Sequence, residues 1–279
     1  MEKANYPIAL MCRVLGVSRS GWYASCARTR PSVREIQDAD LIETIREIHT
    51  ASRETYGSPR VHAQLVRDGV DVGRDRVARL MRAAGLKGRV RRRFKVTTNS
   101  KHGRPVAPNA LNREFTAESS DSVWCADITY IPTAAGWTYL AAIIDVATRM
   151  IVGWSMASHM RTELVESALL NALTARAPAS RLVHHSDRGS QYASASYREL
   201  LEQHGIECSM SRAGDCYDNA LIESFFGTIK QEWVHHHRWP NLIDARAATH
   251  DYIEVFYNRQ RLHSSLGYRT PAEADEAAA

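Results

Sequence analysis

VWCADITYIPTAAGWTYLAAIIDVATRMIVGWS, residues 123–155, contains three apolar stretches separated by two short turns. The stretches lie at residues 123–131, 138–145 and 150–155, and their β-branched and aromatic content is typical of strands. Connections this short join antiparallel strands, because a parallel connection needs about a dozen residues or more. The segment therefore predicts a sheet that begins with three antiparallel strands.

Helices and strands alternate in the residues that follow. The apolar patterns and turn residues predict, in chain order, a helix, a buried strand, a helix, a strand and a long helix. Their expected ranges are 162–176, 182–186, 194–204, 206–210 and 219–233. This order predicts an α/β domain in which helices flank a mixed sheet.

The N-terminal part is predicted to be all helical. Helices at 8–15 and 19–27, joined by a glycine-containing turn, have the pattern of a helix-turn-helix. Ser32 and Glu35 form a capping box for a third helix, and a second helical pair follows. We expect three parts: a helix-turn-helix with a connecting helix, a second such unit with a basic linker, and the α/β domain with a helical C-terminal extension. Their expected limits are 1–52, 53–108 and 109–279.

The formal net charge of +5 is unevenly divided along the 279 residues. Residues 1–118 hold 23 of the 36 lysines and arginines but 12 of the 31 acids. Between Arg74 and Arg104, 12 basic residues accompany one acid, a density that favours a polyanion such as DNA over a merely solvated surface. The candidate DNA contacts in this region are Arg74, Arg76, Arg79, Arg89, Arg91, Arg92, Arg93 and Lys95.

Several classes of protein are excluded by the composition. No apolar run approaches the roughly 20 residues of a membrane span, and the first residues lack the features of a secretory signal. The five cysteines are scattered and never spaced as C-x-x-C, which is typical of reduced thiols. We therefore expect a soluble intracellular protein without a disulfide framework or a zinc knuckle.

Three acids are placed where the predicted topology brings them to one end of the sheet. Asp127 lies within the first strand, Asp187 ends the fourth strand, and Glu223 lies on the long helix. Hard divalent cations bind clustered carboxylate oxygens, and a metal ion offsets the repulsion among the acids. We expect all three carboxyl groups to lie within a few ångströms of one or two metal ions.

Several segments together resemble a known family. Thirty-five residues separate Asp187 from Glu223, and Lys230 follows Glu223 by seven. With Asp127, this spacing resembles the D, D-35-E pattern of transposases and retroviral integrases, with the additional basic residue of one bacterial insertion-sequence group. The segments that resemble the second-frame (OrfB) product of that group are GVSRSGWY at 16–23, YGSPRVHAQL at 56–65, HSDRGSQY at 185–192, DNALIESFFGTIKQE at 218–232 and YNRQRLHSSLGYRTPAE at 257–273.

The resemblance implies a ribonuclease-H-like catalytic domain of the integrase core type. It implies a transposase that cleaves and transfers DNA strands to move an insertion sequence, with Asp127, Asp187 and Glu223 as catalytic residues that also hold Mg²⁺ or Mn²⁺, two ions in each site. It further implies DNA at the element ends and at the target, an upstream-frame protein or fusion, and a bacterial cytoplasmic, nucleoid-associated location. Two alternatives stay open: a catalytically idle DNA-binding regulator, and a ribonuclease-H-type nuclease.

Both ends of an element must be held together during transposition, so we expect at least a dimer on DNA. Two protomers with two-fold symmetry would each hold one end.

Neighbouring polar residues have candidate roles beside the acids. Asn219, Glu223 and Lys230 lie on one stripe of the predicted helix, which favours DNA contacts for Asn219 and Lys230. His185 is a candidate contact to a phosphate or to a metal-bound water. Trp137 is expected to pack in the core or within a hairpin rather than to stack on bases.

Overall fold

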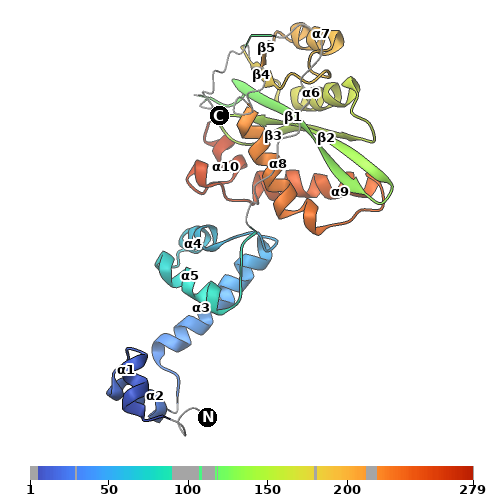
Figure 1. The fold of residues 1–279 in the computed structure, drawn as a ribbon. Helices are drawn as coiled ribbons and strands as arrows, with labels where there is room; N and C mark the ends of the chain where they lie inside the picture. The colour runs from blue at the N-terminus through green and yellow to red at the C-terminus, as the bar shows by residue number, and fades with distance from the viewer. Residues whose placement is uncertain are drawn as a thin grey trace.

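The computed structural model describes residues 6–28, 30–89, 107–108, 117, 119–178, 181–211 and 219–278. A series of helices at the N-terminal end leads into a domain built on one sheet (Figure 1). Among the described residues, no helix is long and apolar enough to cross a membrane. The three-part division of the chain at residues 52 and 108 stays a prediction.

The sheet has five strands in the order β3-β2-β1-β4-β5. Strands β1, β2 and β3 pair in antiparallel register, as the segment 123–155 predicts, whereas β4 is parallel to β1 and β5 is parallel to β4. The expected mixed, ribonuclease-H-like sheet is therefore present. The strands are β1 (Val123–Thr133), β2 (Gly136–Asp145), β3 (Ile151–Ala157), β4 (Val183–Ser186) and β5 (Glu207–Met210).

Alternate residues of the strands contribute to two separate cores, one on each face. Cys125 and Ile131 of β1 pack against α8 (Ala220–Glu232), α9 (Leu242–His250) and the π-helix η4 (Asp251–Tyr257). Trp124 and Ala126 point to the other face, which α6 (Thr162–Arg176) and α7 (Ala195–Gln203) cover. Because strand residues alternate between faces, Asp127 belongs to the face that α8 covers.

Close packing between β3 and α6 requires a glycine. A Cβ atom at Gly153 would lie 2.5 Å from the carbonyl oxygen of Ala168 and 2.5 Å from the Cβ of Ala172. Both alanines belong to the buried side of α6. The small residues on the strand and on the helix therefore allow the two backbones to approach each other.

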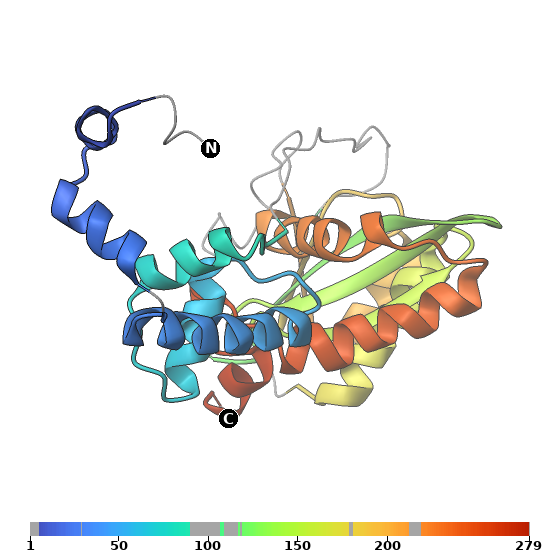
Figure 2. The ribbon, with the colours of Figure 1, turned by 90° about the horizontal axis from the view of Figure 1, so that it is seen from below.

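The N-terminal helices are α1 (Ile8–Val14), α2 (Arg19–Ala27), α3 (Val33–Ala51), α4 (Ser58–Arg67) and α5 (Arg74–Ala83). The expected capping box of α3 is present, with Ser32 and Glu35 bonded reciprocally. Helices α3, α4 and α5 share a small apolar core, whereas α1 and α2 lie at the far end of α3 (Figures 1 and 2). Helix α4 accommodates Pro59 in its first turn, where a proline N–H is not needed.

Residues 257–271 join the helical region to the sheet domain. The Tyr56 hydroxyl donates to the carbonyl oxygen of Gln260 and accepts from the backbone N–H of Leu262, at 3.1 and 2.7 Å. The Arg60 Nε donates to the carbonyl oxygen of Leu262 at 2.9 Å. Leu262 itself lies within the core of α3–α5. This segment includes the 3-10 helix η5 (Ser264–Leu266) and leads into α10 (Pro271–Glu276).

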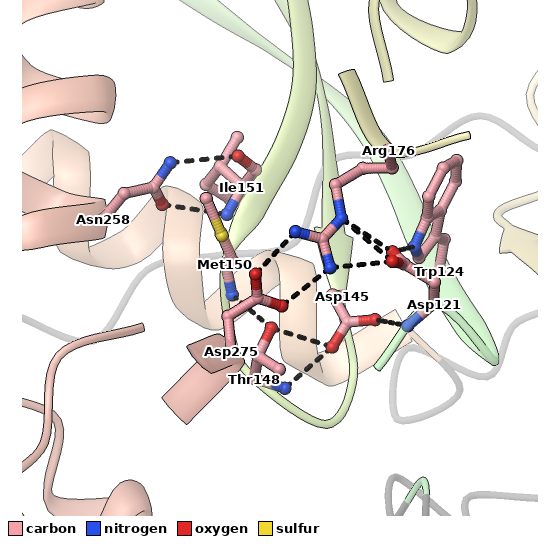
Figure 3. A network of polar contacts seen from close by, with 9 residues as sticks. All are labelled: Asp121, Trp124, Asp145, Thr148, Met150, Ile151, Arg176, Asn258 and Asp275. Carbon is pink, nitrogen blue, oxygen red and sulfur yellow. Dashed lines mark hydrogen bonds and ion pairs between the residues drawn. The ribbon is translucent and has the colours of Figure 1, made fainter. Parts of the chain in front are cut away.

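A polar network anchors the C-terminal helix to the sheet (Figure 3). Arg176, at the end of α6, donates to both oxygens of Asp121 and to both oxygens of Asp275 in α10, at distances of 2.6–3.1 Å. Beside it, the buried Asp145 accepts hydrogen bonds from the backbone N–H groups of Thr148 and Asp121, at 2.7 and 2.8 Å. Arg176 therefore ties the last helix to the start of the sheet.

Candidate active site

Asp127 and Asp187 come together through the register of two parallel strands. The β1–β4 pairs run from Val123 opposite Val183 to Ala126 opposite Ser186. The next residue on each strand is an aspartate, so Asp127, which lies within β1, is beside Asp187 at the carboxyl end of β4. Ligand sites in α/β sheets are commonly found there. One carboxyl oxygen of Asp127 accepts from the N–H of Ile128, and Oδ1 of Asp187 accepts from Gly189, at 2.7 and 2.8 Å.

Glu223 reaches this region from α8. The apolar side of the helix, which includes Ile222, Phe225 and Ile229, packs against the sheet, and Glu223 is half-buried beside it in the first turn. Asn219, just before the helix, donates from Nδ2 to the carbonyl oxygen of Ala126 at 3.2 Å. Asn219 therefore ties the start of α8 to the residue that precedes Asp127.

The electrostatics of Asp127 show that the three acids act on one another. Burial raises its pKa well above the ordinary range, and the charges of Asp187 and Glu223 raise it further. The hydrogen bond from Ile128 and the charge of Lys230 oppose this rise. The negative charge of ionised Asp127 therefore destabilises the folded protein when no metal is bound.

Three carboxyl groups suit a divalent cation, which prefers carboxylate oxygens. The charges of Asp187 and Glu223 raise the pKa of Asp127, and a bound cation would offset this repulsion. The described residues nevertheless include no group of three His, Cys, Asp or Glu side chains at the distances of a metal site. The shared metal site of the three acids stays a prediction.

Lys230 lies two helical turns after Glu223, above an aromatic ring. Its Nζ is 4.3 Å from the centre of the Tyr130 ring, which is a cation–π contact. Burial lowers the pKa of Lys230, and the charge of Asp127 opposes this shift. The ammonium group therefore lies within the electrostatic field of Asp127, and its contact with DNA stays a prediction.

His185 has protein partners on both sides of its ring. Nδ1 lies 2.8 Å from the hydroxyl of Ser209, Nε2 lies 3.2 Å from the hydroxyl of Ser211, and the side chain is fully buried. Its predicted contact with DNA stays a prediction.

His184 is also buried, and burial lowers its pKa to about 3.

The predicted DNA contacts on α5 are involved in ion pairs. Arg76 and Arg79 both bind Asp38 of α3, at 2.8 and 2.7 Å, whereas Arg74 is exposed. Arg89 donates to the carbonyl oxygen of Glu232. Arg91, Arg92, Arg93 and Lys95 lie outside the described residues. The roles of all these side chains in DNA binding stay predictions.

Tyr192 lies near the acids, a position that sequence reasoning did not anticipate, whereas Trp137 packs within the hairpin, one of its two expected placements. Tyr192 is buried, and its pKa is raised first by burial and then by Tyr197, Asp127 and Asp187, so its ring is close to the acids. Its place at the end of the HSDRGSQY segment was the available signal. Trp137 is not a core residue: it is 57% exposed and packs against Tyr130 within the hairpin.

Comparison with known proteins agrees with this arrangement. The Integrase core domain family matches residues 117–216 and, in a second form, residues 204–271, and the HTH-like domain family matches residues 35–94. A chain of a simian T-cell lymphotropic virus intasome complex overlaps with a TM-score of 0.49 and 14% identity, over 83% of this chain and 74% of that chain. At those values the overlap carries no argument about activity.

Two relatives align over nearly the whole chain. A Shigella sonnei protein described as the insertion element IS600 uncharacterized 31 kDa protein is 48% identical over 94% of this chain and 96% of its own length. Transposase InsF for insertion sequence IS3A of Escherichia coli strain K12 is 39% identical over 98% of this chain and 95% of its own length. With its integrase core and HTH-like domain, the chain belongs to the family of IS3-type insertion-sequence transposases.

Proposed function

We propose that this transposase cleaves DNA at the ends of an insertion element and transfers the strands at a site formed by Asp127, Asp187 and Glu223. The observation that supports the proposal is the β1–β4 register, in which Asp127 within β1 lies beside Asp187 at the end of β4, together with Glu223 in the first turn of the helix that packs on the same face of the sheet. The electrostatic coupling of Asp127 to both other acids supports the same assignment.

Asp127, Asp187 and Glu223 would hold two Mg²⁺ or Mn²⁺ ions. Bound there, the metal supplies positive charge that activates a nucleophilic water or 3′-hydroxyl and stabilises the leaving oxygen. The chain's own contribution is to position carboxylates: Asn219 fixes the start of α8 relative to β1, and the hydrogen bonds from Ile128 and Gly189 orient the two aspartates. Lys230 is placed to contact a substrate phosphate.

We further propose that the basic region from Arg74 to Lys95 contacts DNA phosphates and that at least two protomers assemble on DNA. The first cut would join one end of the element to the other, and the resulting branched form would become a circle. An upstream-frame protein or fusion would act with the chain in the nucleoid of the bacterial cytoplasm. Light scattering with and without an element-end duplex tests whether at least two protomers assemble on DNA. A 1:1 complex that still joins two ends would contradict it.

Two other functions would use the same fold. A catalytically idle DNA-binding regulator has no physical need for three mutually repelling acids, one of which has a pKa that is raised well above its ordinary range. A ribonuclease-H-type nuclease would use the acids but would not account for the helical region that matches the HTH-like domain family. Strand transfer between DNA ends is therefore the function that the geometry supports best.

The experiment incubates the purified protein with labelled element ends and Mg²⁺, beside an RNA–DNA hybrid. We expect joined DNA strands from the wild type, none from Asp127→Asn, and similar DNA affinity in both proteins. Asp145→Asn removes a neighbouring acid that is bonded to Thr148, and it serves as a control for indirect damage to the sheet. Cleavage of the hybrid alone would favour the nuclease, and full activity of Asp127→Asn would refute the site.

A further inference from the structure

The β1–β2 hairpin presents two exposed aromatic side chains. Tyr130 is 48% and Trp137 is 57% exposed, and their rings meet edge to face with centres 5.1 Å apart. The hairpin carries no charged residue from Ile128 to Ile144. Large aromatic rings that remain exposed beside one another on a scaffold with a well-packed core are typical of a contact surface.

Two basic side chains, Lys230 and Arg238, belong to segments that contact this hairpin. The ammonium group of Lys230 lies over the Tyr130 ring. Near the tip of the hairpin, the N–H of Ala134 donates to the carbonyl oxygen of Trp239 at 2.8 Å, which brings the residues that precede Trp239 close to the hairpin. Arg238 precedes Trp239 and is exposed, and the sequence contains no acid between Glu232 and Asp244. The surface therefore combines aromatic rings with positive charge.

Lys230 links the aromatic pair to the acids, because its charge acts on Asp127 and its Nζ lies over the Tyr130 ring. Tyr130 follows Asp127 by three residues, which is about 10 Å along a strand. Trp137 is paired with Pro132, which lies five residues or about 17 Å beyond Asp127. At about 3.4 Å for each base step, a DNA strand that starts at the acids would reach both rings within about five nucleotides. Lys230 lies along the same route, since it is two turns after Glu223.

We propose that Tyr130 and Trp137 form a stacking platform for an unpaired base of the DNA strand that is held at the acids, with Lys230 at the adjoining phosphate. The proposal rests on the proposed function, because the acids define where that strand lies. The base must be unpaired, since the faces of paired bases are covered by their neighbours in the duplex. Aromatic rings combined with a positive groove are typical of sites that bind single-stranded nucleic acid.

Fluorescence anisotropy tests the platform with the full chain in EDTA, so that no cleavage takes place. One probe is a labelled blunt duplex, and the other is the same duplex with an unpaired thymidine tail of about five nucleotides. Trp137→Ala removes the ring, and Trp137→Phe retains an aromatic face. Leu170→Ala, at a 45% exposed position of α6, is the matched control. Thermal unfolding verifies that all the variants are folded.

We expect Trp137→Ala to weaken binding of the tailed probe about fivefold or more and to leave binding of the blunt duplex unchanged. Trp137→Phe should retain most of the affinity for the tailed probe, and Leu170→Ala all of it. Unchanged affinity of Trp137→Ala for the tailed probe overturns the platform. An equal loss on both probes also overturns it, because Trp137 would then contact paired DNA.

The outcome can be separated from a failure of the proposed function. Binding in EDTA requires no catalysis, so a protein that joins element ends but shows no effect of Trp137→Ala contradicts only the platform. Conversely, a selective loss of tailed-probe binding in a protein that joins no DNA ends supports the platform and contradicts the proposed reaction.

Discussion

Replacing Glu232 with glutamine should destabilise the whole protein, because this residue neutralises a buried arginine between the two parts of the chain. Arg261 donates to both carboxyl oxygens of Glu232 at 2.6 and 2.8 Å, and both side chains are 5% exposed. The Tyr252 hydroxyl donates to the same carboxylate at 3.2 Å, and Arg60 of α4 lies 3.7 Å from it. Glu232→Gln keeps the shape of the side chain but leaves the guanidinium groups of Arg261 and Arg60 without this counter-charge.

The expected cost follows from the burial of the pair. Breaking a buried ion pair by removing one partner typically costs about 3–5 kcal/mol, which is a large part of the stability of an ordinary domain. Burial and the positive charges of Arg261, Arg60 and Arg149 lower the pKa of the adjacent His263 to about 2, so this histidine supplies no compensating charge change near neutral pH. Glu43→Gln, which removes an exposed ion pair with Arg46 on α3, should cost less than about 1 kcal/mol.

Urea unfolding of the wild type and the variants measures this difference. A lower transition midpoint at an unchanged slope would report lost stability. The double variant Glu232→Gln/Arg261→Met should be more stable than the sum of the two single changes predicts. The second change removes the buried arginine charge that the first leaves unpaired. If Glu232→Gln unfolds at the same urea midpoint as the wild type, the ion pair between Glu232 and Arg261 does not stabilise the protein and the reasoning is refuted.

Three further changes have defined outcomes. Asp127→Asn should stabilise the metal-free protein by about 1.4 kcal/mol for each unit by which the pKa of Asp127 is raised. Thermal unfolding should show this gain near neutral pH and its loss as the pH falls toward the ordinary aspartate value of about 3.9, where the wild-type carboxyl is protonated in both states; a gain that does not depend on pH would contradict the assignment. Asp275→Asn should cost about 1–3 kcal/mol by weakening the hold of Arg176 on α10, and an unchanged melting temperature would show that α10 needs no such anchor. Replacing Arg91, Arg92 and Arg93 with alanine should weaken binding to all duplexes alike and reduce the salt dependence by up to about 0.9 log unit for each lost phosphate contact; an unchanged salt slope in a binding titration would show these arginines to be solvated surface.

Most of the sheet domain is predictable from its apolar pattern. The three strands within 123–155 and the helix α6 lie within a few residues of the expected limits. The pattern succeeds because each strand is long or strongly apolar and each turn is short. The capping box at Ser32 is predictable for a similar reason, since its geometry depends on residues only three positions apart.

The features that the sequence did not reveal depend on contacts between distant segments. The pair formed by Glu232 and Arg261 is 29 residues apart, and its burial depends on Tyr56 and Arg60 some 200 residues away. The exposure of Trp137 also depends on which elements cover the hairpin, and its ring stays largely open to solvent. For the acids, the predicted strand order brings Asp127 and Asp187 to neighbouring strands, whereas the register that sets them side by side depends on pairing between segments about 60 residues apart.

Anomalous diffraction from a crystal that contains Mn²⁺ tests most directly whether Asp127, Asp187 and Glu223 form one metal site. We predict one or two anomalous peaks at the β1–β4 edge, in contact with oxygens of all three side chains, and a Glu223 carboxyl that is drawn toward the aspartates. The peaks should disappear in crystals of Asp127→Asn. Mn²⁺ bound elsewhere, or bound at this edge without Glu223, would contradict the shared site.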